Sequence, residues 1–220
     1  WALANAAWPN VNADARAQCR SQFVTRASNV LAAAKAKPYR AEYRIQFYGT
    51  AGNEAIIARQ LMNGYAFSSN TTEFLSYALL AIDAQLGANA LAYPYLTGVG
   101  TYRIMRPVSN ISEHDGIEDP VPGLVINGPA PACNYYYRLD AARYPDTFGY
   151  PLARRYFDVG EIGTAESGIG GQAAFLWGVA GLAQPGVPEP AAGAVFLLAA
   201  CCRLLCRAGG LGTNDKSVYH

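Results

Sequence analysis

Residues 156–178, YFDVGEIGTAESGIGGQAAFLWG, are the stretch from which the fold is most directly inferred. Three carboxylates, Asp158, Glu161 and Glu166, come just before an apolar run in which hydrophobic side chains recur at helical spacing. We therefore predict a helix over residues 167–182 with an acidic N-terminal end. Acidic residues are stabilised at this end by the helix dipole, so the pattern by itself also has a purely structural explanation.

Three further helices are predicted upstream. Residues 14–35 carry apolar side chains at helical spacing and are followed by Pro38, and residues 53–67 repeat the pattern. The third helix begins at Thr71 or Thr72, either of which can cap it, and ends before Gly87, where a left-handed C-terminal cap belongs. With no convincing pair of strands, these segments predict an all-α fold.

The segment between the third and fourth helices, residues 88–165, shows no sustained periodicity of either kind. Its eight prolines argue against long hidden helices, and a loop of this length inside a domain is usually functional. It is rich in tyrosine, whose flat apolar ring and hydroxyl suit sugar rings as well as core packing. A long aromatic loop that leads to carboxylates at the start of a helix is typical of a sugar-cleaving site.

The composition limits the other classes of function. The 220 residues suffice for one good-sized domain, and a formal net charge of +1 gives no electrostatic reason to expect a nucleic-acid partner. Five cysteines without zinc-ligand spacing and only two histidines make a zinc site of the usual kind improbable. No cofactor is expected. The acidic turn of Asp115, Glu118 and Asp119 leaves a structural calcium ion as an alternative to a solvated turn.

The last 37 residues, 184–220, differ in composition from the rest. Val187-Pro188-Glu189-Pro190 leads into the apolar run 191–202, which is followed by Arg203 and Arg207. The run is short for a membrane-spanning helix, which needs about 20 apolar residues. The Val-Pro-Glu-Pro motif and the order of spacer, apolar run and basic flank resemble a PEP-CTERM sorting signal. A buried terminal helix is the structural alternative.

Three segments, taken in order, resemble the C-terminal half of a family 9 glycoside hydrolase domain of the cellulase type. Residues 82–100, IDAQLGANALAYPYLTGVG, are similar to the family's Leu-Gly-x-Asn and Thr-Gly-x-Gly patterns. Residues 115–131, DGIEDPVPGLVINGPAP, are similar to a stretch ending in Gly-Gly-Pro-Asn. Residues 156–174 resemble the Tyr-x-Asp stretch and the catalytic glutamate. The resemblance implies that residues 1–183 are part of an (α/α)6 barrel.

The same resemblance implies a function, the hydrolysis of β-linked glucans with inversion of configuration. Glu166 matches the general acid, which protonates the leaving oxygen while an aspartate base activates water on the opposite face. Tyr156 and Asp158 are expected to shape the site, and Tyr95 and Arg106 to contact the substrate. The base normally comes from an Asp-rich motif that this chain lacks, so we expect the chain alone to be inactive.

The sequence also departs from the family pattern. Val108, Ser109 and Asn110 replace a His-His-Arg segment that binds sugar, and none of them supplies the same charge-assisted hydrogen bonds. Ala130 and Ala165 each replace an asparagine. Arg106 and His114 lie nearby as partial substitutes. These losses leave a glycan-binding relative with impaired catalysis, or a structural surface protein, as alternatives to an active hydrolase.

The tail adds expectations about location. A PEP-CTERM signal implies a Gram-negative bacterium in which the protein is held at the inner membrane until a sorting protease removes the tail. The protein is then secreted or kept at the cell surface. The expected partners are therefore a β-glucan or related polysaccharide and a sorting protease.

Overall fold

Residues 12–37, 51–69, 72–129, 151–156, 158, 160 and 162–183 are described by the structure, a computed structural model of the chain. The chain divides into two units, Trp1–Leu182 and Ala183–His220, and all the described residues except Ala183 lie in the first. The structure does not describe Glu161, Ala130, the sorting-signal motif or the loop tyrosines at 135–137.

Four long helices form the body of the first unit: α2 (Ala13–Lys35), α3 (Ala51–Phe67), α4 (Thr72–Gln85) and α7 (Ile169–Leu182). All four lie where the apolar periodicity predicts them. No strand occurs among the described residues, which confirms the all-α prediction for that part of the chain. Of these four helices, none combines the length and the apolar character that a membrane crossing requires.

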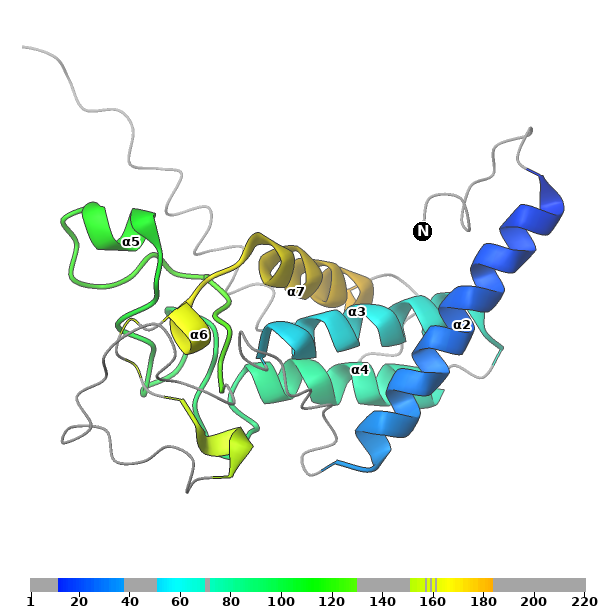
Figure 1. Ribbon diagram of the computed structural model, residues 1–220, viewed down its shortest axis with the longest axis horizontal. Helices are drawn as coiled ribbons and strands as arrows, with labels where there is room; N and C mark the ends of the chain where they lie inside the picture. The colour runs from blue at the N-terminus through cyan, green and yellow to red at the C-terminus, as the bar shows by residue number, and fades with distance from the viewer. Residues whose placement is uncertain are drawn as a thin grey trace, which may run out of the picture. The chain divides into compact units, whose positions relative to one another are not determined.

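Helix α3 is central and packs against α2, α4 and α7 (Figure 1). Small residues permit these close contacts. Gly64 of α3 faces Ala27 of α2 so closely that an added Cβ would collide with the Ala27 side chain. Gly178 of α7 faces Ala58 of α3 in a similar but less tight contact. A Cβ added at Gly178 would lie 3.3 Å from the Cβ of Ala58. The core is therefore built from glycine and alanine contacts between helices, filled by larger residues such as Leu61.

The helix ends follow the local sequence. Asn12 caps α2 by accepting hydrogen bonds from the backbone N–H groups of Asp14 (2.8 Å) and Ala15 (3.1 Å). Beyond α4, Gly87 has φ of +119°, and Ala88 N–H donates to the Asp83 carbonyl at 2.8 Å. The predicted glycine cap is confirmed.

Asn89 then orders the chain that leaves α4. Its Nδ2 donates to the carbonyls of Ala84 (2.7 Å) and Tyr93 (2.8 Å), and its Oδ1 accepts from Leu91 N–H at 3.0 Å. The side chain is 7% exposed. Asn89 therefore replaces the missing secondary structure with its own hydrogen bonds and fixes the direction in which the long loop starts.

The long loop contains only short elements among its described residues: α5 (Asn110–His114), a 3-10 turn η3 (Leu152–Arg154) and α6 (Ile162–Ala165). It is held together by backbone pairing without strands. Leu96 and Val125 form an isolated antiparallel bridge, in which Thr97 N–H donates to Leu124 (2.9 Å) and Ile126 N–H donates to Tyr95 (3.1 Å). Beside this bridge Gly98 has φ of +75° and contacts Pro122, a position that a side chain would not fit.

Candidate active site

Glu166 lies between α6 and α7, on a backbone that is held from two sides. On one side it forms a parallel bridge with Val108: Val108 N–H donates to Ala165 (2.9 Å), and Ser167 N–H donates to Val108 (3.4 Å). On the other side Asn127 N–H donates to the Glu166 carbonyl (3.0 Å). Gly128 N–H donates to Thr164 at 2.7 Å. Segments that are about 40 and 60 residues away in sequence therefore fix the position of this glutamate.

The Glu166 side chain is half-buried, and the amide of Asn127 lies beside its carboxylate. Asn127 Nδ2 lies 3.5 Å from Glu166 Oε2, at the outer limit of a hydrogen bond. A half-buried carboxyl with a weak amide contact keeps room for another partner, as a proton donor to a substrate requires. Asn127 was not among the residues predicted for the site. Asn127 lies 39 residues before Glu166 in the sequence, so its nearness to Glu166 could not be predicted from the sequence.

The segment that replaces His-His-Arg lies directly beside Glu166. Val108 pairs with the Glu166 backbone, and Ser109 begins the turn into α5, where its N–H donates to Glu113 Oε1 at 3.1 Å. Asn110 is exposed as the first residue of α5. His114, the suggested partial substitute, is at the other end of α5 and its Nδ1 lies 3.0 Å from the Asn110 carbonyl. The apolar Val108 is therefore the member of this segment that touches the Glu166 backbone.

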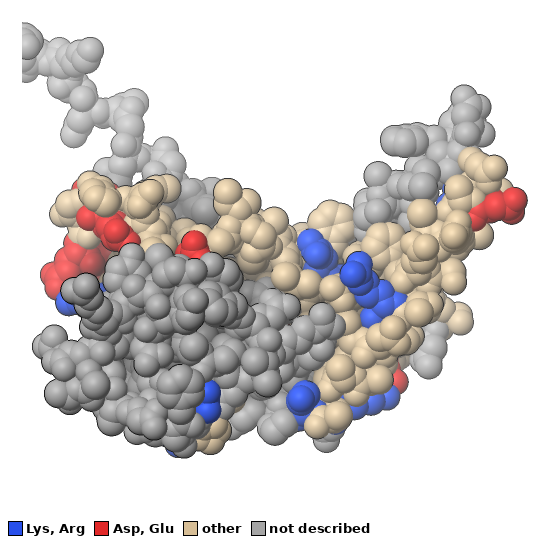
Figure 2. Space-filling view, in the orientation of Figure 1, with Lys and Arg blue, Asp and Glu red and all other residues tan. Residues whose placement is uncertain are grey.

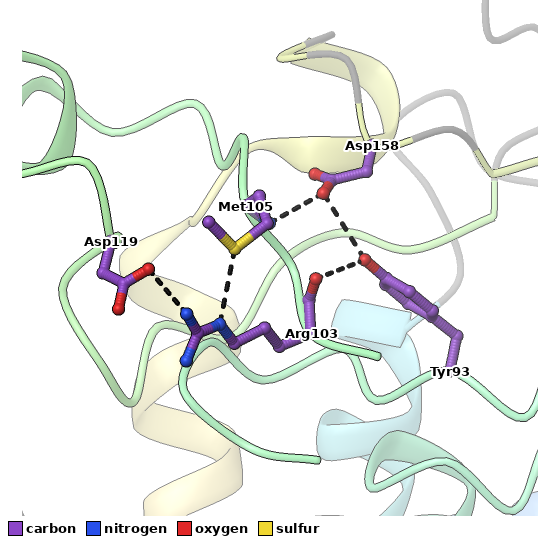
Figure 3. Close-up of polar contacts among 5 residues, drawn as sticks. All are labelled: Tyr93, Arg103, Met105, Asp119 and Asp158. Carbon is purple, nitrogen blue, oxygen red and sulfur yellow. Dashed lines mark hydrogen bonds and ion pairs between the residues drawn. The ribbon is translucent and has the colours of Figure 1, made fainter. Parts of the chain in front are cut away.

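Asp158 holds the segment that leads to Val108. Its Oδ2 accepts a hydrogen bond from Met105 N–H at 2.7 Å (Figure 3). Its Oδ1 accepts one from Arg106 N–H at 2.9 Å. Hydrogen bonds that a carboxylate accepts from two successive N–H groups are stronger than bonds between neutral groups. Asp158 therefore fixes the backbone at 105–106, two residues before Val108.

Two tyrosine hydroxyls complete the surroundings of Asp158. Tyr93 Oη and Tyr156 Oη each lie 3.4 Å from a carboxylate oxygen. Tyr93 also donates to the Arg103 carbonyl at 2.7 Å, which is the better bond for its single hydrogen (Figure 3). Burial, together with the Asp158 carboxylate, raises the pKa of both tyrosine hydroxyls far above the usual value. In the folded protein both hydroxyls therefore keep their protons at pH values where a free tyrosine begins to lose them.

The tyrosine rings pack against one another beneath this cluster. Tyr156 contacts Tyr93 and Tyr95 with ring centroids 5.5 and 5.6 Å apart. Tyr95 is 3% exposed and Tyr156 is 7% exposed, in a core shared with Ile104 and Ile126. Such burial favours packing for Tyr95 and Tyr156, the alternative that the sequence left open for the loop tyrosines. Arg106, by contrast, is exposed, and its backbone is anchored by Asp158.

Two of the three acidic side chains of the turn have separate polar partners. Asp119 pairs with Arg103 at 2.7 Å (Figure 3), and Asp115 Oδ1 accepts the Ile117 N–H at 2.9 Å within the turn. No group of three or more histidine, cysteine or acidic residues is close enough to hold a metal ion among the described residues. Asp115, Glu118 and Asp119 are all exposed, as a solvated turn requires.

A comparison with family models finds glycosyl hydrolase family 9 over residues 4–179. A relative, the xyloglucan-specific endo-β-1,4-glucanase of Bacteroides ovatus, is 30% identical over 138 residues, which are 57% of this chain and 21% of that protein. Among solved structures, the family 9 endoglucanase J30 is 26% identical with a TM-score of 0.64, over 81% of this chain and 33% of that one.

A second structure, AaCel9A in complex with cellobiose-like isofagomine, is 23% identical with a TM-score of 0.61, over 79% of this chain and 33% of that one. This chain therefore spans about a fifth to a third of the length of these relatives. The neighbours have the (α/α)6 barrel fold, and the four long helices are part of such a barrel, as the sequence resemblance predicted.

Proposed function

The chain belongs to glycosyl hydrolase family 9, and we propose that it carries the general acid, Glu166, of an inverting hydrolase of β-linked glucans. The observation that supports this most is the position of Glu166, just before α7, where its backbone is fixed from two sides. Among the described residues its carboxyl makes a weak contact with Asn127 and no stronger hydrogen bond. A fixed backbone with an available carboxyl is what proton transfer to a leaving oxygen needs.

The other predicted residues have two kinds of role in the proposed site: contact with the substrate, and support of the backbone around Glu166. Arg106 is the candidate for direct contact with sugar hydroxyls, because its side chain is exposed while Asp158 holds its backbone. Asp158, Tyr156 and Tyr95 shape the site from below: one fixes the 105–106 backbone and two fill the core beneath it. The water-activating aspartate must come from elsewhere, because the Asp-rich motif of the family is absent from these 220 residues.

The test is hydrolysis of soluble β-glucans, xyloglucan among them, by the longest natural polypeptide that contains this chain. We expect Glu166→Gln to lower kcat by about 10²- to 10⁴-fold, the range of general acid catalysis. Glu118→Gln, which removes an exposed carboxyl from the acidic turn, is the matched control and should leave kcat unchanged. Equal activity in both variants would contradict the role of Glu166.

A glycan-binding relative with impaired catalysis is the second candidate. It is favoured by Val108, which contacts the Glu166 backbone where the family's sugar-binding side chains are expected. Affinity electrophoresis in glucan-containing gels separates the two candidates. Retarded migration without any reducing sugar released would support the binding protein, and neither binding nor hydrolysis would favour a structural surface protein.

For the tail we propose a PEP-CTERM-type sorting signal in residues 184–220, which a sorting protease would remove at the inner membrane of a Gram-negative bacterium. The support is the order of Val187-Pro188-Glu189-Pro190, the apolar run and the arginines. Mass spectrometry of the protein from a host with this sorting system should find a C-terminus near the motif. A Glu189→Ala, Pro190→Ala variant should keep the whole tail, and an unprocessed wild-type tail would contradict the proposal.

A further inference from the structure

The segment 124–128 lies between two other parts of the chain and forms hydrogen bonds to both. On one side its backbone pairs with residues 95–97. On the other side Asn127 N–H donates to the Glu166 carbonyl at 3.0 Å, and Gln172 of α7 donates from its Nε2 to a carbonyl of the same segment at 2.9 Å. The backbone of Asn127 is therefore fixed relative to Glu166 and to α7.

Asn127 contacts Glu166 twice, through its backbone and through its side chain. In addition to the backbone hydrogen bond, Asn127 Nδ2 lies 3.5 Å from Glu166 Oε2, and both side chains are half-buried. Hydrogen bonds in a catalytic site are often long without substrate and tighten when the substrate binds. Only this orientation of the amide gives a hydrogen bond to an ionised carboxylate, because the amide oxygen has no hydrogen to donate. The fixed backbone therefore directs an amide N–H toward one particular oxygen of Glu166.

The other neighbours of Glu166 do not provide a donor of this kind. Among the described residues the Glu166 carboxylate forms no ion pair, and Ala165, which precedes it, has only a buried methyl group. Acidic side chains gather over the α5 loop (Figure 2), where the Glu113 carboxylate accepts the Ser109 N–H at 3.1 Å. In the described part of the chain, Asn127 is therefore the side-chain donor that contacts Glu166.

We propose that Asn127 is a positioning residue for the proton transfer: its amide holds Oε2 of Glu166 and leaves Oε1 to carry the proton. This inference rests on the proposed role of Glu166 as general acid. The proton on Oε1 moves to the leaving glycosidic oxygen, which keeps the electron pair of the breaking bond, while a water deprotonated by the aspartate base attacks the sugar carbon. Glu166 is then a carboxylate, and the Asn127 N–H stabilises it, because hydrogen bonds to ionised groups are stronger than those to neutral groups.

The test measures kcat and KM on a soluble β-glucan for the longest natural polypeptide that contains this chain. Asn127→Ala should lower kcat about tenfold and leave KM nearly unchanged, because the lost hydrogen bond is made to a charged group and not to the substrate. In a Glu166→Gln background the same substitution should lower kcat less than about twofold, because the carboxylate is gone. Gln18→Ala, which removes an exposed amide from α2, is the matched control and should leave kcat unchanged.

Asn127→Asp separates the donor from the shape of the side chain, and it replaces the alanine variant as the test if circular dichroism shows that the latter does not fold. It keeps the size but removes the N–H₂ group, so kcat should fall at least as far as in Asn127→Ala. Wild-type kcat in Asn127→Asp, or equal losses from Asn127→Ala in both backgrounds, would overturn the proposal. An unchanged Asn127→Ala beside an impaired Glu166→Gln would overturn this inference alone, whereas an unchanged Glu166→Gln would contradict the general acid itself.

Discussion

Asp158 acts on the site through the backbone that it holds. It accepts hydrogen bonds from two successive N–H groups, at 2.7 and 2.9 Å, and so fixes the segment whose next residues reach Glu166. The sequence predicts that Asp158 belongs to the site, because it lies eight residues before Glu166 in the same acidic stretch. Its task could not be predicted, because the N–H groups that it binds are 52 and 53 residues away.

The Asp158→Asn variant tests whether these two hydrogen bonds stabilise the 105–106 backbone. The amide has one acceptor oxygen, so one of the two backbone N–H groups faces an N–H₂ group and loses its partner. We expect the free energy of unfolding to fall by about 1–3 kcal/mol, measured by urea denaturation. Asp115→Asn, in the exposed turn, is the control with the same chemical change. Equal stability of the two variants would contradict the stabilising role of these two hydrogen bonds.

The raised pKa of the buried Tyr156 makes the folding stability depend on pH. Burial, with Asp158 close by, raises the pKa of Tyr156 above its usual 10.0, so the folded protein holds this proton more tightly than the unfolded chain. Stability from this group is therefore complete below pH 10 and is lost as the pH rises further. Tyr156→Phe should flatten the fall in Tm between about pH 10 and 11. Tyr102→Phe is the control, because Tyr102 is 77% exposed, and it should leave this fall in Tm unchanged.

At the scale of the elements, apolar periodicity and capping residues were enough to locate α2, α3, α4 and α7. The sequence placed the end of α4 correctly, because the Gly87 cap acts locally. The hydrogen bonds of Asn89 that order the chain beyond it were not predicted. It could not show how residues 88–129 are ordered, because their bridges pair positions tens of residues apart without any strand pattern. For the same reason the contact of Val108 with Glu166 emerged only from the structure.

The helix packing depends on a glycine at the contact of α2 and α3. Gly64→Ala would place a Cβ against Ala27, and we expect it to destabilise the protein by about 1–3 kcal/mol through overpacking. Gly170→Ala in α7 meets nothing within 4 Å, so it should be neutral or stabilising because alanine favours helices. Thermal unfolding compares the two. A tolerated Gly64→Ala would mean that the helices are not in this close contact.

At the scale of the whole molecule, a part of a barrel exposes surface that a complete barrel covers. We therefore expect the isolated chain to associate at increasing concentration and to bind a hydrophobic dye. Leu176→Ser, on the exposed apolar face of α7, should reduce both effects. Ile111→Ser is the control, because Ile111 is as exposed (68%) as Leu176 but lies on α5. Equal effects of the two substitutions would contradict a specific role of the α7 face.

The measurement that tests the central assignment most directly compares two substrates in the longest natural polypeptide that contains this chain and in its Glu166→Gln variant. One is an unactivated β-glucan, whose leaving oxygen needs a proton; the other is a dinitrophenyl β-glucoside, whose leaving group departs without one. If Glu166 is the general acid, the variant loses about 10²- to 10⁴-fold on the glucan and little on the activated substrate. An equal loss on both substrates, or no loss on either, would contradict that role.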